Sequence, residues 1–278
     1  MFEMKFPKHI EIEITNHCQL KCVMCPNRVM TRPKGFMSCD ILDKILSEAK
    51  GRTRSCYMHM IGEPLLHKQL LPMIQKVSSC GIRTSISTNA VLLDEDMAIS
   101  LLNSPLDELT LALDSMRKEV YERYRVGSDF DTVVENIDRA ISLRRGLPNS
   151  RTQIEMQLIV MVDNVDDVPE FRAKYMTMLE GIGKLSVKGY STFAGKVEDL
   201  GPDQTPPRRF TCGKLNSSIA VHWNGDLVVC CRDFDGVTVV GNVHQNSILQ
   251  IFNSDRYNEM RQDMRNRNYE HLVLCKDC

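Results

Sequence analysis

Three cysteines near the N-terminus have the residue type and the spacing of a metal-cluster site. Cys18, Cys22 and Cys25 form the pattern C-x3-C-x2-C in the segment HCQLKCVMCP. Three thiolates can bind three irons of a [4Fe–4S] cube and leave the fourth iron open to a small ligand. Structural zinc usually needs paired C-x2–4-C halves and four closed ligands. The spacing therefore favours an iron–sulfur site with one open position over a zinc site or unconnected core cysteines.

A second group of cysteines near the C-terminus could bind another metal centre. Its members are Cys212, Cys230, Cys275 and Cys278. Four thiolates complete either a tetrahedral zinc site or a fully ligated iron–sulfur cube, and the spacing alone does not distinguish the two. Cys231 directly follows Cys230, and adjacent side chains of an extended segment point to opposite faces. We therefore expect only one of these two thiols to be a ligand, while the other is a buried small side chain or has a separate role.

The overall composition makes metal ligation a better interpretation of the cysteines than disulfide bonding. The chain has 278 residues, 11 cysteines and a formal net charge of −1. No segment has the roughly 18 to 20 uncharged apolar residues of a membrane span, and the N-terminus lacks an apolar signal core, so we expect a cytoplasmic protein without a membrane partner. A reducing cytosol does not maintain a disulfide framework.

The balanced charge gives no field for a polyanion, so we expect no nucleic-acid partner.

Strand and helix patterns alternate along roughly the first 190 residues and predict an α/β scaffold for these sites. Such alternation indicates a parallel sheet with right-handed crossovers, either an open doubly wound sheet or a barrel, with the chemistry at the strand ends. Strands are predicted at residues 10–14, 57–61, 82–87, 108–113, 154–162 and 184–190, and helices at residues 38–50, 67–79, 94–102, 131–144 and 167–180.

The regular alternation ends at residues 196–210, where prolines and glycines predict a linker. Beyond it, the segments 218–222 and 227–231 flank Asn224-Gly225, which predicts a β-hairpin. A helix is predicted at residues 247–265. The chain length allows one large α/β domain with a small C-terminal appendage.

At its first three cysteines the chain resembles the radical S-adenosylmethionine (SAM) enzymes, whose signature is C-x3-C-x2-C after the first strand. The resemblance extends over nearly the whole chain and implies a partial (β/α)6 TIM-like barrel over residues 1–195. In that family the open iron binds SAM, and reduction of SAM yields a 5′-deoxyadenosyl radical that takes a hydrogen atom from the substrate. The resemblance therefore implies a [4Fe–4S] cluster and SAM as cofactors, with an electron donor such as flavodoxin or ferredoxin.

Further motifs of that family stand at the ends of the predicted strands. Gly62-Glu63-Pro64 resembles the G-G-E-P motif that contacts the SAM amino group, with Ile61 in place of the first glycine. The resemblance also implies that Asp114 faces SAM or the substrate as a catalytic residue. The other implied SAM contacts are Thr88, Asn89 and Arg125.

The four C-terminal cysteines resemble the auxiliary-cluster ligands of the SPASM/twitch class of radical SAM enzymes. This resemblance implies a twitch domain over residues 211–278 that holds a second [4Fe–4S] cluster. Within the class the chain is similar to the 2-deoxy-scyllo-inosamine dehydrogenases of antibiotic biosynthesis, but Phe193 stands where those enzymes have an arginine. Cys231 is similar to a thiol that donates a hydrogen atom in some epimerases of the class.

The resemblance implies a radical SAM oxidoreductase that acts on a small molecule, a carbohydrate or an aminocyclitol, and oxidises an alcohol. Such oxidation needs an electron acceptor, which an auxiliary cluster can be, and a base for the alcohol proton. The alternatives are an epimerase with Cys231 as the hydrogen donor and an enzyme that modifies a peptide. The non-enzymatic alternative is a zinc or iron–sulfur binding module, and the open three-cysteine site beside Gly62-Glu63-Pro64 argues against it.

Overall fold

Six parallel strands form an open barrel wall in the computed structural model, which describes residues 5–203 and 212–278. Hydrogen bonds join the strands in their chain order. The strands are β1 (His9–Ile12), β2 (Ser55–Tyr57), β3 (Arg83–Thr88), β4 (Glu108–Ala112), β5 (Gln153–Val160) and β6 (Gly183–Gly189).

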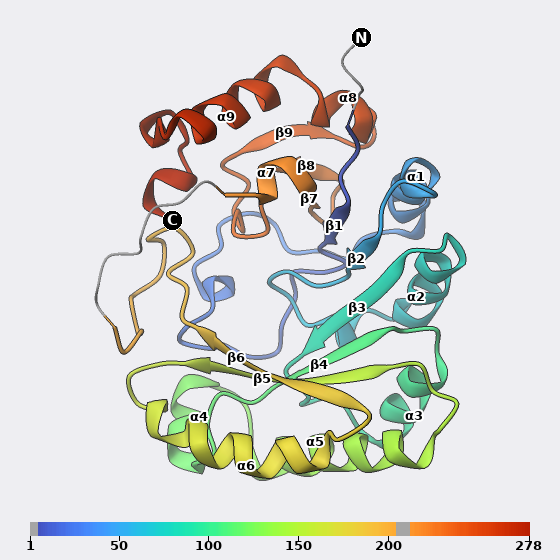
Figure 1. Cartoon of the computed structure of the whole chain (residues 1–278), viewed down its shortest axis with the longest axis vertical. Coiled ribbons are helices and arrows are strands. Elements are labelled where there is room, and N and C mark those ends of the chain that lie inside the picture. Colours follow the sequence, from blue (N-terminus) through green and yellow to red (C-terminus); the bar gives the residue numbers. More distant parts are fainter. Residues whose placement is uncertain (1–4, 204–211) are drawn as a thin grey trace.

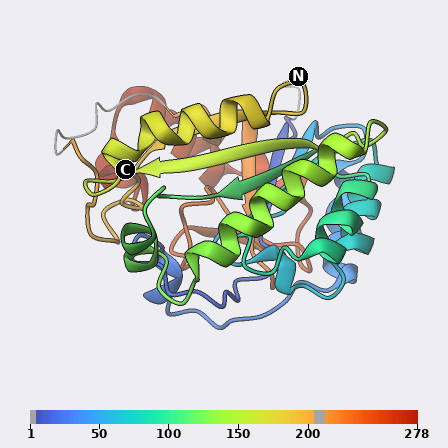
Figure 2. The same cartoon turned by 90° about the horizontal axis from the view of Figure 1, so that it is seen from below.

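Helices follow these strands and cover the outer face of the barrel wall. They are α1 (Cys39–Ala49), α2 (Leu70–Ser79), α3 (Glu95–Asn103), α4 (Lys118–Tyr124), α5 (Phe130–Gly146) and α6 (Val168–Met178). In Figure 1, α5 and α6 run along the outside of β4, β5 and β6. Figure 2 shows the same two helices from below. The architecture is the partial barrel that the sequence predicts.

The predicted strands and helices of the barrel are all present, although their ends differ. The strand predicted at residues 57–61 is observed at Ser55–Tyr57, because beyond Tyr57 only the bond from the Met58 N–H to the Ser85 carbonyl, at 2.8 Å, continues the ladder. The sequence does not predict α4. This helix has seven residues, and the side chain of its N-cap residue Arg117 makes no capping hydrogen bond, so the usual start signal is missing.

The two faces of the barrel strands differ in polarity. Successive side chains of a strand point to opposite faces, and the face beneath the helices is apolar. The alternate positions are polar, and they include Glu11, Ser85, Thr110, Glu155 and Gln157. Closed eight-stranded barrels usually fill their interior with branched apolar side chains. The polar inner face of this open barrel leaves a polar interior that can bind a ligand.

The C-terminal part continues the same sheet. Strand β7 (Ser218–Val221) pairs in parallel with β1, and the antiparallel strands β8 (Asp226–Val228) and β9 (Val239–Asn242) follow, which confirms the predicted hairpin. The helix predicted at residues 247–265 is divided into α8 (Ile248–Phe252) and α9 (Asp255–Asn266). The division occurs because the Ser254 side chain accepts a hydrogen bond from the Tyr257 N–H and starts a new helix there.

The segment predicted as a linker is only partly described. Residues 196–203 form no helix or strand, and residues 204–210 lie outside the described residues. Beyond this segment the short helix α7 (Lys214–Ser217) leads into β7. A search of the helices in the two described ranges finds none that combines the length and the hydropathy of a membrane span.

Candidate active site

The loop after β1 brings the first three cysteines together at the carboxyl ends of the strands. The loop is anchored on the end of α4 by backbone bonds from Lys21 to Val126 and from Val23 to Tyr124, each 2.9 Å long. All three thiols line one cavity of about 190 Å³, which is lined by Cys18, Cys22, Cys25, Gly62, Glu63, Thr88, Asn89 and Arg125, among others. Eight of the residues that the sequence selects therefore share one cavity.

Burial controls the ionisation of these thiols. It raises the pKa of Cys18 and Cys22, and it raises the pKa of Cys25 to about 12. A bound iron would reverse this preference, because a coordinated thiol is deprotonated by the charge of the metal. The donor chemistry of this cavity suits a cluster held by three thiolates.

The carboxylate of Glu63 joins the loop after β2 to the end of β3 by hydrogen bonds. Its Oε1 accepts hydrogen bonds from the Leu65 N–H at 3.0 Å and from the Thr88 hydroxyl at 2.8 Å, and its Oε2 accepts one from the Asn89 N–H at 2.9 Å. A carboxylate has about four acceptor positions, so one position remains for a ligand. Pro64 does not line the cavity. It begins the 3-10 turn η2 (Pro64–Leu66), which follows Glu63 directly in the chain.

Asn89 connects the cysteine loop to the end of β3. Its amide nitrogen donates to the Cys18 sulfur at 3.7 Å, and its amide oxygen accepts a bond from the Gln19 side chain at 3.0 Å. The next residue, Ala90, has φ of 61°, in the left-handed region that glycine usually occupies, and the chain makes a tight turn there.

Arg125 lines the cavity and is held there by Asp114. The Arg125 guanidinium donates to Asp114 Oδ2 through Nε at 2.8 Å and through Nη2 at 2.5 Å, and Asp114 Oδ1 accepts the Ile159 N–H at 3.0 Å. Asp114 is fully buried. Burial alone would lower the pKa of Arg125, but the negative charge of Asp114 outweighs this effect and raises the pKa. The sequence suggested that Asp114 faces SAM or the substrate, whereas the structure turns its carboxylate to Arg125 and the backbone.

The charges around this cavity also suit an amino-acid ligand. Glu63 offers a carboxylate to an ammonium group, and Arg125 offers a guanidinium to a carboxylate. These two groups have the complementary charges of the methionine part of SAM. The residues at this site therefore fit both implied groups, the cluster and SAM.

His59 lines the same cavity and was not selected from the sequence. Its Nδ1 is buried and has no hydrogen-bond partner among the described residues. The hydroxyl of Ser85, on the neighbouring strand, likewise has no partner within the described ranges. Burial lowers the pKa of His59 to about 4, so the ring is neutral near pH 7. The two-residue period from Tyr57 at the end of β2 was the sequence signal that could have identified His59 as inward-facing.

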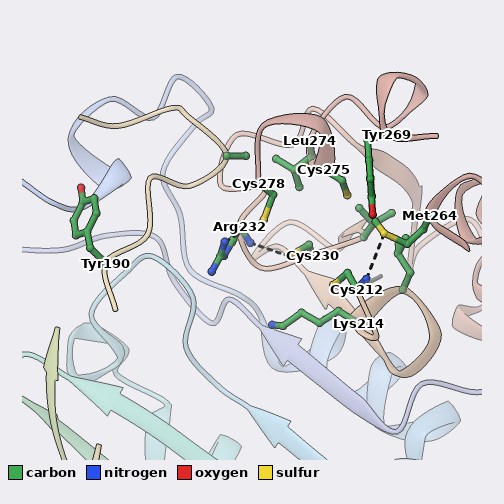
Figure 3. Close-up of a pocket in the computed structure, with 13 residues that line it drawn as sticks. Tyr190, Cys212, Lys214, Cys230, Arg232, Met264, Tyr269, Leu274, Cys275 and Cys278 are labelled. Carbon is green, nitrogen blue, oxygen red and sulfur yellow. Dashed lines mark hydrogen bonds between the residues drawn. The ribbon is translucent and has the colours of Figure 1, made fainter. Parts of the chain in front are cut away.

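The four C-terminal cysteines surround a second cavity of about 280 Å³. Figure 3 shows Cys212, Cys230, Cys275 and Cys278 around it, with Met264 and Leu274 in its apolar wall. Four thiols in such a wall have the donor chemistry of a fully ligated cube. Within residues 5–203 and 212–278, no three His, Cys, Asp or Glu side chains are grouped as a site for a single metal ion.

Of the two adjacent cysteines, Cys230 lines the second cavity and Cys231 does not. Strand β8 ends at Val228, so the strict alternation of an extended strand does not reach these residues. The neighbouring Cys231 thiol lowers the pKa of Cys230 to about 7. Cys231 lines neither cavity, and its sulfur accepts a hydrogen bond from the Lys214 ammonium at 3.3 Å.

Comparison with protein families identifies both parts of the chain. The model of the Radical SAM superfamily matches residues 12–170. The model of the SPASM iron–sulfur cluster-binding domain matches residues 212–278.

Relatives among characterised proteins share these parts to different extents. The chain is 24% identical over 315 residues to the tungsten-containing aldehyde ferredoxin oxidoreductase cofactor-modifying protein of Pyrococcus furiosus, covering 98% of this chain and 87% of that protein. It is 29% identical over 164 residues to a probable GTP 3′,8-cyclase of Methanococcus maripaludis, covering 58% of this chain and 53% of the cyclase. The chain thus spans about half the length of that cyclase.

Two solved structures share the fold. The crystal structure of BtrN in complex with AdoMet and 2-DOIA matches with a TM-score of 0.68 at 18% identity, covering 99% of this chain and 94% of BtrN. Streptococcus suis SuiB bound to the precursor peptide SuiA matches with a TM-score of 0.71 at 15% identity, covering 92% of this chain and 67% of SuiB.

Proposed function

Since this chain belongs to the radical SAM superfamily and carries a SPASM domain, we propose that it oxidises an alcohol carbon of a small polar molecule. Membership implies a [4Fe–4S] cluster with SAM in the barrel and further iron–sulfur content in the SPASM domain. We assign Cys18, Cys22 and Cys25 to the barrel cluster. We assign Cys212, Cys230, Cys275 and Cys278 to a tail cluster, and Gly62, Glu63, Thr88, Asn89 and Arg125 to SAM binding.

The bound groups supply a 5′-deoxyadenosyl radical, which takes the hydrogen atom of the C–H bond, and an iron–sulfur acceptor for the remaining electron. The protein has to provide a polar binding surface and a base for the hydroxyl proton. The inner faces of β3, β4 and β5 provide the surface with Ser85, Thr110, Glu155 and Gln157. We assign the base to His59, because it lines the cavity and its Nδ1 has no hydrogen-bond partner among the described residues.

The observation that carries this proposal is the buried, unpartnered Nδ1 of His59 in the same cavity as the three cysteines. A buried polar atom costs stability unless it gains a partner, and a substrate hydroxyl is such a partner. Phe193 also lines this cavity, at the position where the aminocyclitol dehydrogenases have an arginine. His59 can supply the proton acceptor that Phe193 cannot.

The solved structures support a small substrate more than a peptide. The chain covers nearly all of BtrN, whose crystal contains 2-DOIA, but only 67% of SuiB, whose crystal contains a precursor peptide. A carbohydrate or aminocyclitol therefore remains the preferred substrate class. The electron donor is expected to be a low-potential protein such as flavodoxin or ferredoxin.

The epimerase alternative depends on Cys231. In an epimerase a thiol returns a hydrogen atom to the substrate, so the thiol must reach the cavity. The Cys231 sulfur instead lies beside Lys214 and Cys230. This arrangement favours oxidation over inversion.

The test is anaerobic turnover of the reconstituted enzyme with SAM, a reductant and a panel of aminocyclitols and aminoglycosides. We expect a carbonyl product that has lost two hydrogens, together with 5′-deoxyadenosine. Turnover in D2O and the Cys231→Ala variant serve as controls for the alternative. A product of unchanged mass in water that carries deuterium from D2O, and that disappears with Cys231→Ala, would identify an epimerase and refute the oxidation.

A further inference from the structure

The charged side chains that line the second cavity are of one sign. Among the described residues of its wall, Lys214 and Arg232 are the charged side chains besides the cysteines, and no Asp or Glu side chain lines it. Figure 3 shows both side chains beside the cysteines, Lys214 below Cys212 and Arg232 between Cys230 and Cys278. Two positively charged side chains therefore lie next to the cysteines of this cavity.

Arg232 contacts two of the cysteine sulfurs directly. Its Nη1 donates to the Cys278 sulfur at 3.1 Å, and its backbone N–H donates to the Cys230 sulfur at 3.5 Å. Charge-assisted hydrogen bonds are the stronger kind, and hydrogen bonds to cluster sulfurs tune an iron–sulfur potential. Arg232 thus places a positive charge and two donors at the sulfur ligands.

Lys214 has one partner in the tail and one in the barrel. Its ammonium donates to the Cys231 sulfur at 3.3 Å and to Glu11 Oε1 at 2.6 Å. The other oxygen of Glu11 accepts the Cys231 N–H at 3.1 Å. Glu11 lies on β1, which pairs with β7 directly after the helix that carries Lys214. The Glu11–Lys214 pair therefore joins the barrel to the cysteine site of the tail.

We propose that Lys214 and Arg232 raise the reduction potential of the tail cluster and that Glu11 lowers it. A thiolate-ligated cube is an anion that gains a further negative charge on reduction, so nearby cations favour the reduced form and a nearby carboxylate opposes it. A raised potential suits a cluster that accepts an electron. This inference rests on the proposed tail cluster and gives these three residues the role of tuning it for oxidation.

The test is a potentiometric titration of the tail cluster, followed by electron paramagnetic resonance. The full-length chain with Cys18, Cys22 and Cys25 replaced by Ala isolates the tail signal. In this background Lys214→Met and Arg232→Met should each lower the ratio of reduced to oxidised cluster at a fixed potential by about tenfold. Tenfold corresponds to a shift of about 59 mV for a one-electron couple.

Two matched variants separate charge from structural damage. Glu11→Gln removes the carboxylate but keeps its shape, and it should shift the potential in the opposite direction, upward. Lys214→Arg keeps the charge and should leave the potential close to that of the parent. Damage to the site would move the variants in one common direction, whereas the charge effect predicts opposite signs for Lys214→Met and Glu11→Gln.

The proposal is overturned if Glu11→Gln lowers the potential, if Lys214→Met and Arg232→Met leave it unchanged, or if the tail binds no iron and sulfide. The titration requires neither substrate nor SAM cleavage. A failure of the proposed alcohol oxidation would therefore appear in the product analysis, while a failure of this inference would appear in the potentials or in the iron and sulfide content of the tail.

Discussion

Gly62 offers a sharp test of the predicted SAM site because its environment excludes a side chain. A Cβ on Gly62 would lie 2.1 Å from the carbonyl oxygen of Thr15 and 2.8 Å from the Cα of Asn16. Side chains essentially never approach closer than 3.0 Å. The Gly62→Ala variant must therefore move its backbone by about 0.9 Å, the difference between 3.0 and 2.1 Å, relative to Thr15 in the loop after β1. Because both obstacles are backbone atoms, no side-chain rotation can relieve the contact.

The displacement would act on the adjacent SAM-binding residues. The Glu63 N–H donates to the His17 carbonyl at 2.8 Å, and this bond would be lost or stretched. Overpacking of this kind typically costs about 1–3 kcal/mol of stability. A hydrogen bond to a charged group is worth about 1.5–3 kcal/mol, so a misplaced Glu63 should weaken SAM binding by at least about tenfold.

The assay is anaerobic calorimetry of SAM binding together with denaturant unfolding of the same samples. Gly146→Ala is the matched control, since a Cβ at Gly146 meets nothing within 4 Å and this glycine lies at the end of α5. The control should bind SAM normally and be as stable as the parent, or up to about 1 kcal/mol more stable. Equal SAM affinity and equal stability for the two variants would refute the close packing of Gly62 against the end of β1.

Three further predictions follow from the geometry of the same cavity. Glu63→Gln keeps the shape of the side chain but removes its charge, and it should weaken SAM binding by about tenfold or more in the same calorimetric assay; an unchanged affinity would exclude Glu63 from the SAM site. Asp114→Asn leaves the charge of Arg125 buried without its counter-ion and should lower the free energy of unfolding by about 3 kcal/mol, whereas Lys118→Met, which breaks an exposed ion pair, should leave that free energy nearly unchanged. The pKa of His59 is lowered to about 4 by burial, while it is about 6.5 in an unfolded chain, so the unfolded state binds the proton first as the pH falls. Between pH 6.5 and pH 4 the parent should therefore lose up to about 3 kcal/mol of stability that His59→Gln does not lose, and parallel stability curves for the two proteins would contradict the lowered pKa.

The sequence predicts those parts of the site whose chemistry depends on spacing along the chain. Cys18, Cys22 and Cys25 lie in one loop, so their separation in sequence fixes their proximity in space. The strand ends that carry Glu63 and Asn89 are predicted equally well, because the carboxyl ends of parallel strands meet at one edge of the sheet.

Side-chain partners that are distant in sequence could not be predicted in the same way. Asp114 was expected to face the ligand, but it pairs with Arg125 because an ionised carboxylate at a fully buried position needs a counter-ion. His59 lies within the strand predicted at residues 57–61, and the two-residue period places it on the inner face. The sequence does not show that its Nδ1 lacks a partner, because hydrogen-bond partners depend on residues that only the fold brings together.

The sequence does not predict how the tail is attached to the barrel sheet. A separate C-terminal domain joined by a linker would leave the positions of the two cysteine sites only loosely related. Instead, β7 pairs with β1 in the register His9 to Ser218 through Ile12 to Val221, and Glu11 bonds to Lys214 across 203 positions of sequence. Since β1 leads into the first cysteine loop and β7 begins directly after Lys214, one ladder of backbone hydrogen bonds fixes the position of both sites. One continuous sheet therefore connects the polar inner face of the barrel with the cysteine cavity of the tail. A change in the charge of Glu11 should alter the electrostatic potential at both sites.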